Sequence, residues 1–281
     1  MTQYDAEILI PSPQQSEPPK HLGRTLVLDL ALVLLIMFIA VLAVQILIVA
    51  IRAPQQGINF TNFRNLDEKA LLRLIGVEGI VATLVLQNAI FIAVPIIRTK
   101  LFQHASLRQL GFHAEHPLRL LAFGIGLGII TLFGNAILGL LFAQSGIRQN
   151  QAAQYPLFQG DYLGQFAFFI GAAILAPLGE EILFRGYVFN TLRRMWAAGR
   201  GALMAAYAIS ALLFALAHSL AATQGLIALL VPAFFMGLIL AWGMHRTGSI
   251  IPCFIAHSMN NSLALIALVT CVNNPGMCPN I

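Results

Sequence analysis

Two adjacent carboxylates are the residues in this sequence whose type and spacing first suggest chemistry. Glu180 and Glu181 are the only acidic residues after Asp161, and Arg185 follows the second of them by four positions. On a helix, Glu181 and Arg185 share a face and can form an ion pair, whereas Glu180 points about 100° away. A buried carboxylate outside that pair suits a general base, which takes a proton from water. The same residues could instead only tie neighbouring helices together.

Two later motifs place histidines four residues from a second notable side chain. Phe214 precedes His218 by four positions, and His257 precedes Asn261 by four. Residues at this spacing point the same way from a helix. One such histidine alone is typical of a hydrogen-bonded core residue. Their recurrence together with the double glutamate indicates an active site.

The composition shows what kind of elements must position these residues. Of 281 residues, 58% are apolar and only 10% are charged, whereas soluble domains carry about 25% charged residues. The sequence therefore excludes a soluble enzyme and predicts an integral membrane protein. The net charge is +5, but the basic residues form no cluster interleaved with aromatic residues, so we expect no nucleic-acid partner. Three cysteines without a Cys-x-x-Cys pair exclude a zinc ribbon.

Apolar segments of about 20 residues, the length of a bilayer crossing, recur along the chain. They cover residues 26–51, 71–97, 118–142, 164–196, 202–219, 224–244 and 249–270. We predict an all-α, polytopic membrane helical bundle with seven or eight transmembrane helices. The eighth would arise if the long fourth segment broke near Pro177 and Gly179. Ionisable residues inside such segments are costly and usually functional.

The predicted organisation has four parts. They are a disordered cytoplasmic tail (1–24), N-terminal transmembrane helices (25–163), a catalytic transmembrane core (164–270) and a short C-terminal tail (271–281). With seven spans, most Lys and Arg residues of the connections fall on the side of the N-terminus. The positive-inside rule then predicts a cytoplasmic N-terminus, in the plasma membrane, and an external C-terminus. There Cys271 and Cys278 could form a disulfide.

Other polar and glycine-rich features have simpler interpretations. We expect Asp29 to lie at the membrane interface and Glu78 to pair with Arg73 on its own helix. The three alternating glycines of residues 124–128 predict a close helix-packing face. The histidines of residues 104–116 belong to a polar connection, where we expect a solvated segment without a catalytic role.

Helix geometry supports bringing the first two motifs together. If a turn lies near residue 199, then Glu180 and His218 are equally far from it along the two arms of a hairpin, about 28 Å. If the next segment, residues 224–244, crossed the whole membrane, His218 would lie too far toward the outer side to share the depth of Glu180. A broken connection through residues 219–225 would remove the conflict.

The three motifs together resemble those of the CPBP family of intramembrane proteases, also called the Abi or CAAX type II endopeptidase family. The match runs from the double glutamate with its arginine, through the Phe-His pair, to the His-Asn pair, and covers residues 164–265. The resemblance implies an endopeptidase that hydrolyses a peptide bond of a membrane-associated protein or peptide. The motifs of zinc-dependent, aspartyl and serine intramembrane proteases are absent.

The resemblance also implies a role for each motif residue. Glu180, assisted by His218, would activate a water molecule. His257 and Asn261 would stabilise the oxyanion. The supporting residues would be Glu181, Arg185 and Phe214.

Whether this site binds a metal ion stays open. We favour a site without a cofactor, because hydrogen bonds alone can polarise the scissile carbonyl. The alternative is Zn²⁺ held by Glu180, His218 and His257 with water as the fourth ligand.

Two other functions stay open for the same polar cluster. One is a non-catalytic membrane protein, such as a bacteriocin-immunity or binding factor, which uses the cluster for packing or ligand binding. The other is a transporter with a proton-linked carboxylate pair. A transporter predicts internal repeats, and none is visible.

Overall fold

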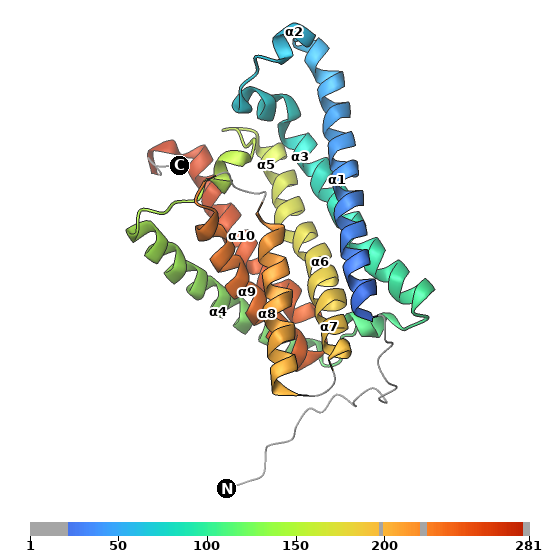
Figure 1. The fold of residues 1–281 in the computed structure, drawn as a ribbon. Helices are drawn as coiled ribbons and strands as arrows, with labels where there is room; N and C mark the ends of the chain where they lie inside the picture. The colour runs from blue at the N-terminus through green and yellow to red at the C-terminus, as the bar shows by residue number, and fades with distance from the viewer. Residues whose placement is uncertain (1–21, 197–198, 220–223, 278–281) are drawn as a thin grey trace.

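Long helices fill the part of the chain that the computed structural model describes, which is residues 22–196, 199–219 and 224–277 (Figure 1). Within these residues, seven helical spans are long and apolar enough to cross a membrane, and no strand occurs. The spans are Leu22–Gln55 (α1), Ala70–Phe102 (α3 with the π-helix η1), Pro117–Gln144 (α4), Tyr162–Met195, Arg200–Ala217 (α8), Leu226–Thr247 (α9) and Ile251–Asn273 (α10). The prediction of an all-α, multi-pass membrane bundle is confirmed.

Shorter elements complete the connections between the spans. They are α2 (Phe60–Phe63), η1 (Arg98–Phe102) and the 3-10 helices η2 (Leu107–Leu110), η3 (Gln151–Gln154) and η6 (Pro275–Met277). The helix α3 itself runs over Glu68–Ile97. Successive spans alternate in direction, so that α1 begins at the lower end in Figure 1 and α10 finishes at the upper end.

The long fourth segment is one continuous span, so the described residues contain seven transmembrane helices and not eight. It consists of α5 (Tyr162–Phe169), η4 (Ile170–Leu175), α6 (Ala176–Glu180), η5 (Glu181–Phe189) and α7 (Asn190–Met195), where η4 and η5 are π-helical. Pro177 does not break the span, because its missing N–H falls directly after the widened turns of η4. Both glutamates therefore lie where the helix changes from α to π geometry.

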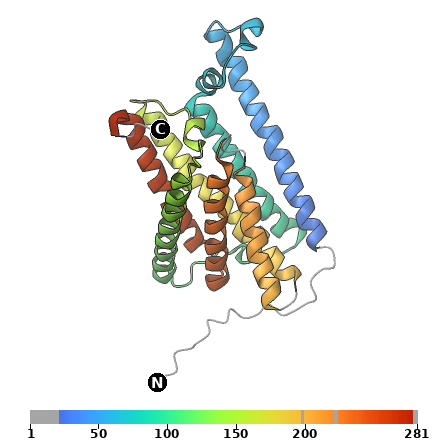
Figure 2. The same cartoon turned by 60° about the vertical axis from the view of Figure 1, so that its left-hand side comes forward.

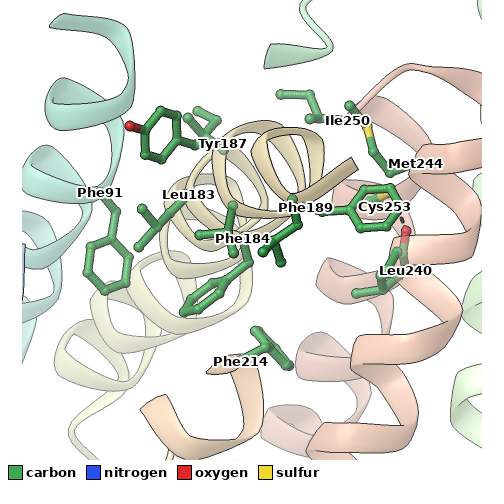
Figure 3. Close-up of a cluster of buried hydrophobic side chains, with 14 of the residues drawn as sticks. Phe91, Leu183, Phe184, Tyr187, Phe189, Phe214, Leu240, Met244, Ile250 and Cys253 are labelled. Atoms are coloured by element: carbon green, nitrogen blue, oxygen red, sulfur yellow. Dashed lines mark hydrogen bonds between the residues drawn. The ribbon is translucent and has the colours of Figure 1, made fainter. Parts of the chain in front are cut away.

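This fourth span is the centre of the bundle. In its most apolar window 56% of residues are buried, against 6% for α1. Figure 3 shows Phe184 and Phe189 projecting from η5, with Phe91 on one side and Leu240 on the other. The double glutamate is therefore carried by the most enclosed helix, which fixes its position by packing on every side.

Small residues let α4 and α10 pack closely, as the glycine pattern predicts. A Cβ atom on Gly124 would lie 2.9 Å from Ile255 Cβ, and one on Gly128 would lie 2.8 Å from Met259 Sδ. Gly126 faces open space. The predicted packing face is confirmed for the first and third glycine, and it holds the helix that carries His257.

The predicted pairing of Glu78 with Arg73 is wrong. Glu78 pairs instead with Arg52 of α1 at 3.1 Å, because Gly76 has a φ of +68° and interrupts the helix between the two expected partners. Arg52 Nη1 also donates to the carbonyl oxygen of Ile75, beside this interruption. One arginine thus joins α1 to α3, two helices that lie side by side in Figure 2.

Asp29, expected at the interface, lies in a buried ion pair. Its side chain is 11% exposed, and its carboxylate lies 2.9 Å from Nε of Arg98 and also accepts a hydrogen bond from the hydroxyl of Tyr187. These contacts join the lower part of α1 to η1 and to η5.

The connection with the histidines of residues 104–116 is largely exposed, and of its three histidines only His113 is partly buried. His113 Nε2 lies 2.8 Å from the carbonyl oxygen of Gly248, and Ser249 Oγ donates to the carbonyl of His113. The connection is therefore fastened to the turn between α9 and α10.

The predicted break through residues 219–225 lies largely outside the described residues, which omit 220–223. On either side of that gap, α8 ends at Ala217 and α9 begins at Leu226. Near α9, Gln224 N–H donates to Asn150 Oδ1 in the connection before α5. At the C-terminus, Cys278 lies outside the described residues, so its pairing with Cys271 stays a prediction.

Candidate active site

Glu181 is the centre of a buried polar cluster. Its Oε1 accepts hydrogen bonds from Arg185 Nη1 at 3.0 Å and from His257 Nδ1 at 2.8 Å. The side chains of all three residues are at most 1% exposed. The ion pair predicted from the four-residue spacing is present, and the contact with His257 is an addition that local spacing could not reveal. Because a carboxylate only accepts, Nδ1 of His257 carries a hydrogen.

Glu180 lies next to this cluster without a hydrogen bond to it. Its Oε2 is 3.7 Å from His257 Nε2, which is beyond hydrogen-bonding distance. Within the described residues, this buried oxygen has no hydrogen-bond partner, although the side chain is 12% exposed. Buried carboxylate oxygens normally have partners. Glu181 Oε2 also lacks a partner, but Glu181 is fully enclosed and engaged through Oε1, so Glu180 is the less committed and more accessible carboxylate of the pair.

Phe214 connects the two histidines. The centre of its fully buried ring is 4.8 Å from the ring of His218 and 5.5 Å from the ring of His257. The Arg185 guanidinium carbon lies 4.2 Å from the centre of the same ring. The Phe-His and His-Asn motifs, from two different spans, thus meet across one aromatic side chain.

His218 is held in a defined orientation at the end of α8. Its Nδ1 lies 2.9 Å from the carbonyl oxygen of Phe214. Since a carbonyl only accepts, Nδ1 is the donor, and the neutral ring has its lone pair on Nε2. The histidine is therefore prepared to accept a proton.

Asn261 faces a different part of the fourth span. Its Nδ2 donates to the carbonyl oxygen of Ala172 in η4 at 3.0 Å. Ala172 precedes Glu180 by eight residues, about 12 Å along a helix. The structure does not bring Asn261 to the carboxylates, and its predicted contribution to an oxyanion site stays a prediction.

The three residues named as zinc ligands are not gathered into one group. Within the part of the chain that the structure describes, no group of three His, Cys, Asp or Glu side chains could hold a metal ion. Glu180 and His257 lie close together, and His257 directs Nδ1 at Glu181 and Nε2 toward Glu180. A histidine that binds zinc through one ring nitrogen commonly donates the other N–H to a carboxylate, so the zinc alternative and the site without a cofactor both stay predictions.

Two residues near Glu180 were missed by the sequence interpretation. Asn88, buried in α3, directs Oδ1 at Gly179, where an added Cβ atom would lie 2.2 Å from it. Tyr155 packs its ring 4.8 Å from that of Phe168. Burial raises the pKa of Tyr155 to about 12, with a further contribution from the charge of Glu180. Uncharged residues inside spans, and a tyrosine in a connection, gave no signal because only ionisable residues within spans were considered.

Comparison with known proteins agrees with the motif assignment. Residues 162–263 match the family model described as Rce1-like, type II CAAX prenyl endopeptidase Rce1-like. The chain is also 28% identical over 140 residues to the UPF0177 protein YxdF of Lactococcus lactis subsp. lactis (strain IL1403), covering 49% of this chain and 71% of that protein. No solved structure matches significantly. The resemblance predicted over residues 164–265 is confirmed.

Proposed function

We propose that this protein is an intramembrane endopeptidase that hydrolyses a peptide bond of a membrane-associated protein or peptide. The observation that carries the proposal is the arrangement of Glu180. Its Oε2 has no hydrogen-bond partner among the described residues and lies 3.7 Å from the ring of His257, which Glu181 holds in place. The match of residues 162–263 to the Rce1-like family supports the same class of reaction.

In the proposed reaction, Glu180 and His218 activate the attacking water. Glu180 takes a proton from water as the new bond to the scissile carbonyl carbon forms, and His218 Nε2 accepts a hydrogen bond from the same water. The proton then passes to the amide nitrogen as the C–N bond breaks. General base catalysis of this kind contributes about 10²–10⁴-fold to the rate.

The remaining motif residues position the reacting groups. In the proposal, His257 carries a hydrogen on both ring nitrogens, so that Nε2 donates to the oxyanion while Nδ1 donates to Glu181. Asn261 is the second donor once substrate is bound, and each donor contributes about 10²–10³-fold. Glu181 keeps the hydrogen of His257 on Nδ1 and orients the ring, while Arg185 balances the charge of Glu181. In the proposal no step passes through a metal ion, because hydrogen bonds alone can polarise the scissile carbonyl.

The same proposal gives the protein a location and an orientation. It is an integral multi-pass membrane protein with seven described spans. We propose that it lies in the plasma membrane with its N-terminus in the cytoplasm, as the distribution of Lys and Arg indicates. Its substrate would approach from the lipid bilayer or from the membrane surface.

The decisive experiment measures cleavage of quenched peptides by the purified protein in detergent. We expect Glu180→Gln to abolish cleavage while thermal unfolding is unchanged, and we expect a chelator to have no effect. Glu115→Gln is the matched control, because Glu115 is exposed and paired with Arg108 far along the chain from the motifs. Full activity of folded Glu180→Gln would refute the proposal, and loss of activity with chelator would favour the zinc alternative. A variant that unfolds would favour the non-catalytic reading, in which the cluster only packs helices.

A further inference from the structure

A second site lies where α7 ends and α8 begins, at the lower end of the bundle in Figure 1. There the structure forms a cavity of about 360 Å³. This size falls within the range of about 300–1,000 Å³ that is usual for small-ligand pockets. Its lining consists of Arg193, Trp196, Gly199, Arg200, Ala202 and Leu203. The cavity is distinct from the cluster around Glu181, which lies further inside the bundle.

The two arginines of this cavity have no internal counter-ion. Among the described residues, neither Arg193 nor Arg200 has a hydrogen bond or an ion pair. The guanidinium carbon of Arg193 lies 5.7 Å from the centre of the Phe189 ring. After residue 161 the sequence contains only two acidic side chains, and both belong to the candidate active site. The protein therefore supplies no carboxylate to balance the positive charge of these two arginines, and an anion from outside the protein can do so.

Nearby carboxylates at the same end of the bundle are already engaged. Asp29 pairs with Arg98, and Glu115 pairs with Arg108 at 2.9 Å. A guanidinium group presents several N–H donors in a plane that matches a phosphate or carboxylate, so two of them favour a phosphate-sized anion. Trp196 and Leu203 add an apolar wall, and tryptophan is enriched where membrane meets water.

We propose that this cavity binds the headgroup phosphate of an anionic phospholipid through Arg193 and Arg200. The membrane surface supplies such phosphates at the level where two spans end. Bound lipid would hold the end of α7 against the start of α8. These helices belong to the hairpin that carries the two glutamates on one arm and His218 on the other, so the lipid would steady the active site from a distance.

The test compares the full-length protein in nanodiscs of phosphatidylcholine alone and of phosphatidylcholine with phosphatidylglycerol. We expect phosphatidylglycerol to raise the melting temperature of the wild type by about 5 °C. The double variant Arg193→Gln/Arg200→Gln should lose this rise. The matched control Arg108→Gln removes the same charge from a residue that already has a partner, and should keep the rise.

Three results would overturn the proposal. They are a rise that persists in the double variant, an equal loss in Arg108→Gln, and an equal rise produced by inorganic phosphate in phosphatidylcholine nanodiscs, which would indicate a site for free anions. The single variant Arg200→Gln protects the test against misfolding, because Arg200 is exposed. It should weaken lipid retention measured by native mass spectrometry, and unchanged retention would also contradict the proposal.

Discussion

The two most enclosed carboxylate–arginine pairs among the described residues, Asp29–Arg98 and Glu181–Arg185, differ in how many of their polar atoms have hydrogen-bond partners. Asp29 accepts from both Arg98 and Tyr187 through a single oxygen, and the side chains of the pair are 11% and 24% exposed. Glu181 and Arg185 are fully enclosed. Glu181 Oε2 and two guanidinium nitrogens of Arg185 nevertheless have no partner among the described residues.

On the proposed function, this difference separates an ion pair that only joins helices from one that supports the active site. A pair near a helix end, with access to the surface, joins helices at little cost. Enclosed charges without full hydrogen bonding cost free energy, typically about 1–3 kcal/mol for each unsatisfied group and more for charged groups. A protein retains such a cluster where the charges do something that packing alone cannot, which here is to orient His257 next to Glu180.

The largest expected effect contrasts the two carboxylates that differ most in role. Glu180→Gln should lower kcat for peptide cleavage by about 10²–10⁴-fold, because it removes the general base. Asp29→Asn should leave kcat within about threefold, since Asp29 contacts only Arg98 and Tyr187 among the pairs described. Quenched-peptide kinetics on both variants measure this contrast. Similar losses in the two would mean that the distinction between the pairs does not exist.

The next effect concerns stability. Arg185→Met should lower the free energy of unfolding by about 3–5 kcal/mol, because it leaves Glu181 as an enclosed charge without its partner. Arg98→Met should cost less, because Asp29 is partly exposed and retains Tyr187. Thermal or denaturant unfolding in detergent gives both values. A larger loss for Arg98→Met would reverse the order of the two pairs.

A third effect sharpens the comparison at the backbone. Gly179→Ala should reduce activity and cost about 1–3 kcal/mol, because its Cβ would meet Asn88 Oδ1 at 2.2 Å and push α6 away from α3. Gly126→Ala is the matched control, since Gly126 lies in a helix and faces open space. Unfolding and cleavage assays on the two variants should differ clearly. Equal behaviour would show that the approach of Asn88 is not needed.

The smallest expected effect is that of Tyr155→Phe. The pKa of Tyr155 is raised to about 12, so its hydroxyl stays protonated throughout the neutral range. The variant keeps the ring that packs on Phe168 and loses only the hydroxyl, so kcat/KM should fall by less than about tenfold. The shape of the pH–rate profile between pH 6 and 9 should stay the same. A changed profile would place a titrating tyrosine in the reaction.

Local spacing predicted the contacts that lie within one helix. The pair of Glu181 with Arg185 follows from a separation of four residues and is present at 3.0 Å. The contact of Glu181 with His257 joins residues 76 positions apart, and only packing of the whole bundle decides which glutamate receives it. The sequence therefore indicated the residues and, through the pairing of Glu181 with Arg185, the difference between the two carboxylates, but not the contact of Glu181 with His257.

Two departures from the predictions have physical causes that composition does not reveal. Glu78 misses Arg73 because a glycine with positive φ changes the direction of the backbone between them. The fourth segment stays whole across Pro177 because π-helical turns flank α6 on both sides. Hydropathy located each of these segments, since burial in lipid depends on composition, whereas backbone irregularities depend on neighbours in space.

The π-helical turns of η4 also set the rotational register of everything that follows them. In an α-helix each residue advances the chain by about 100°, and a π-helical turn advances it by less per residue, so η4 takes up more residues for the same rotation. The direction of Glu180 relative to α5 therefore depends on these turns staying π-helical. A substitution that made η4 α-helical without removing a residue would turn the carboxylate away from His257 and, on the proposed function, would act like removal of the general base, although no motif residue is altered.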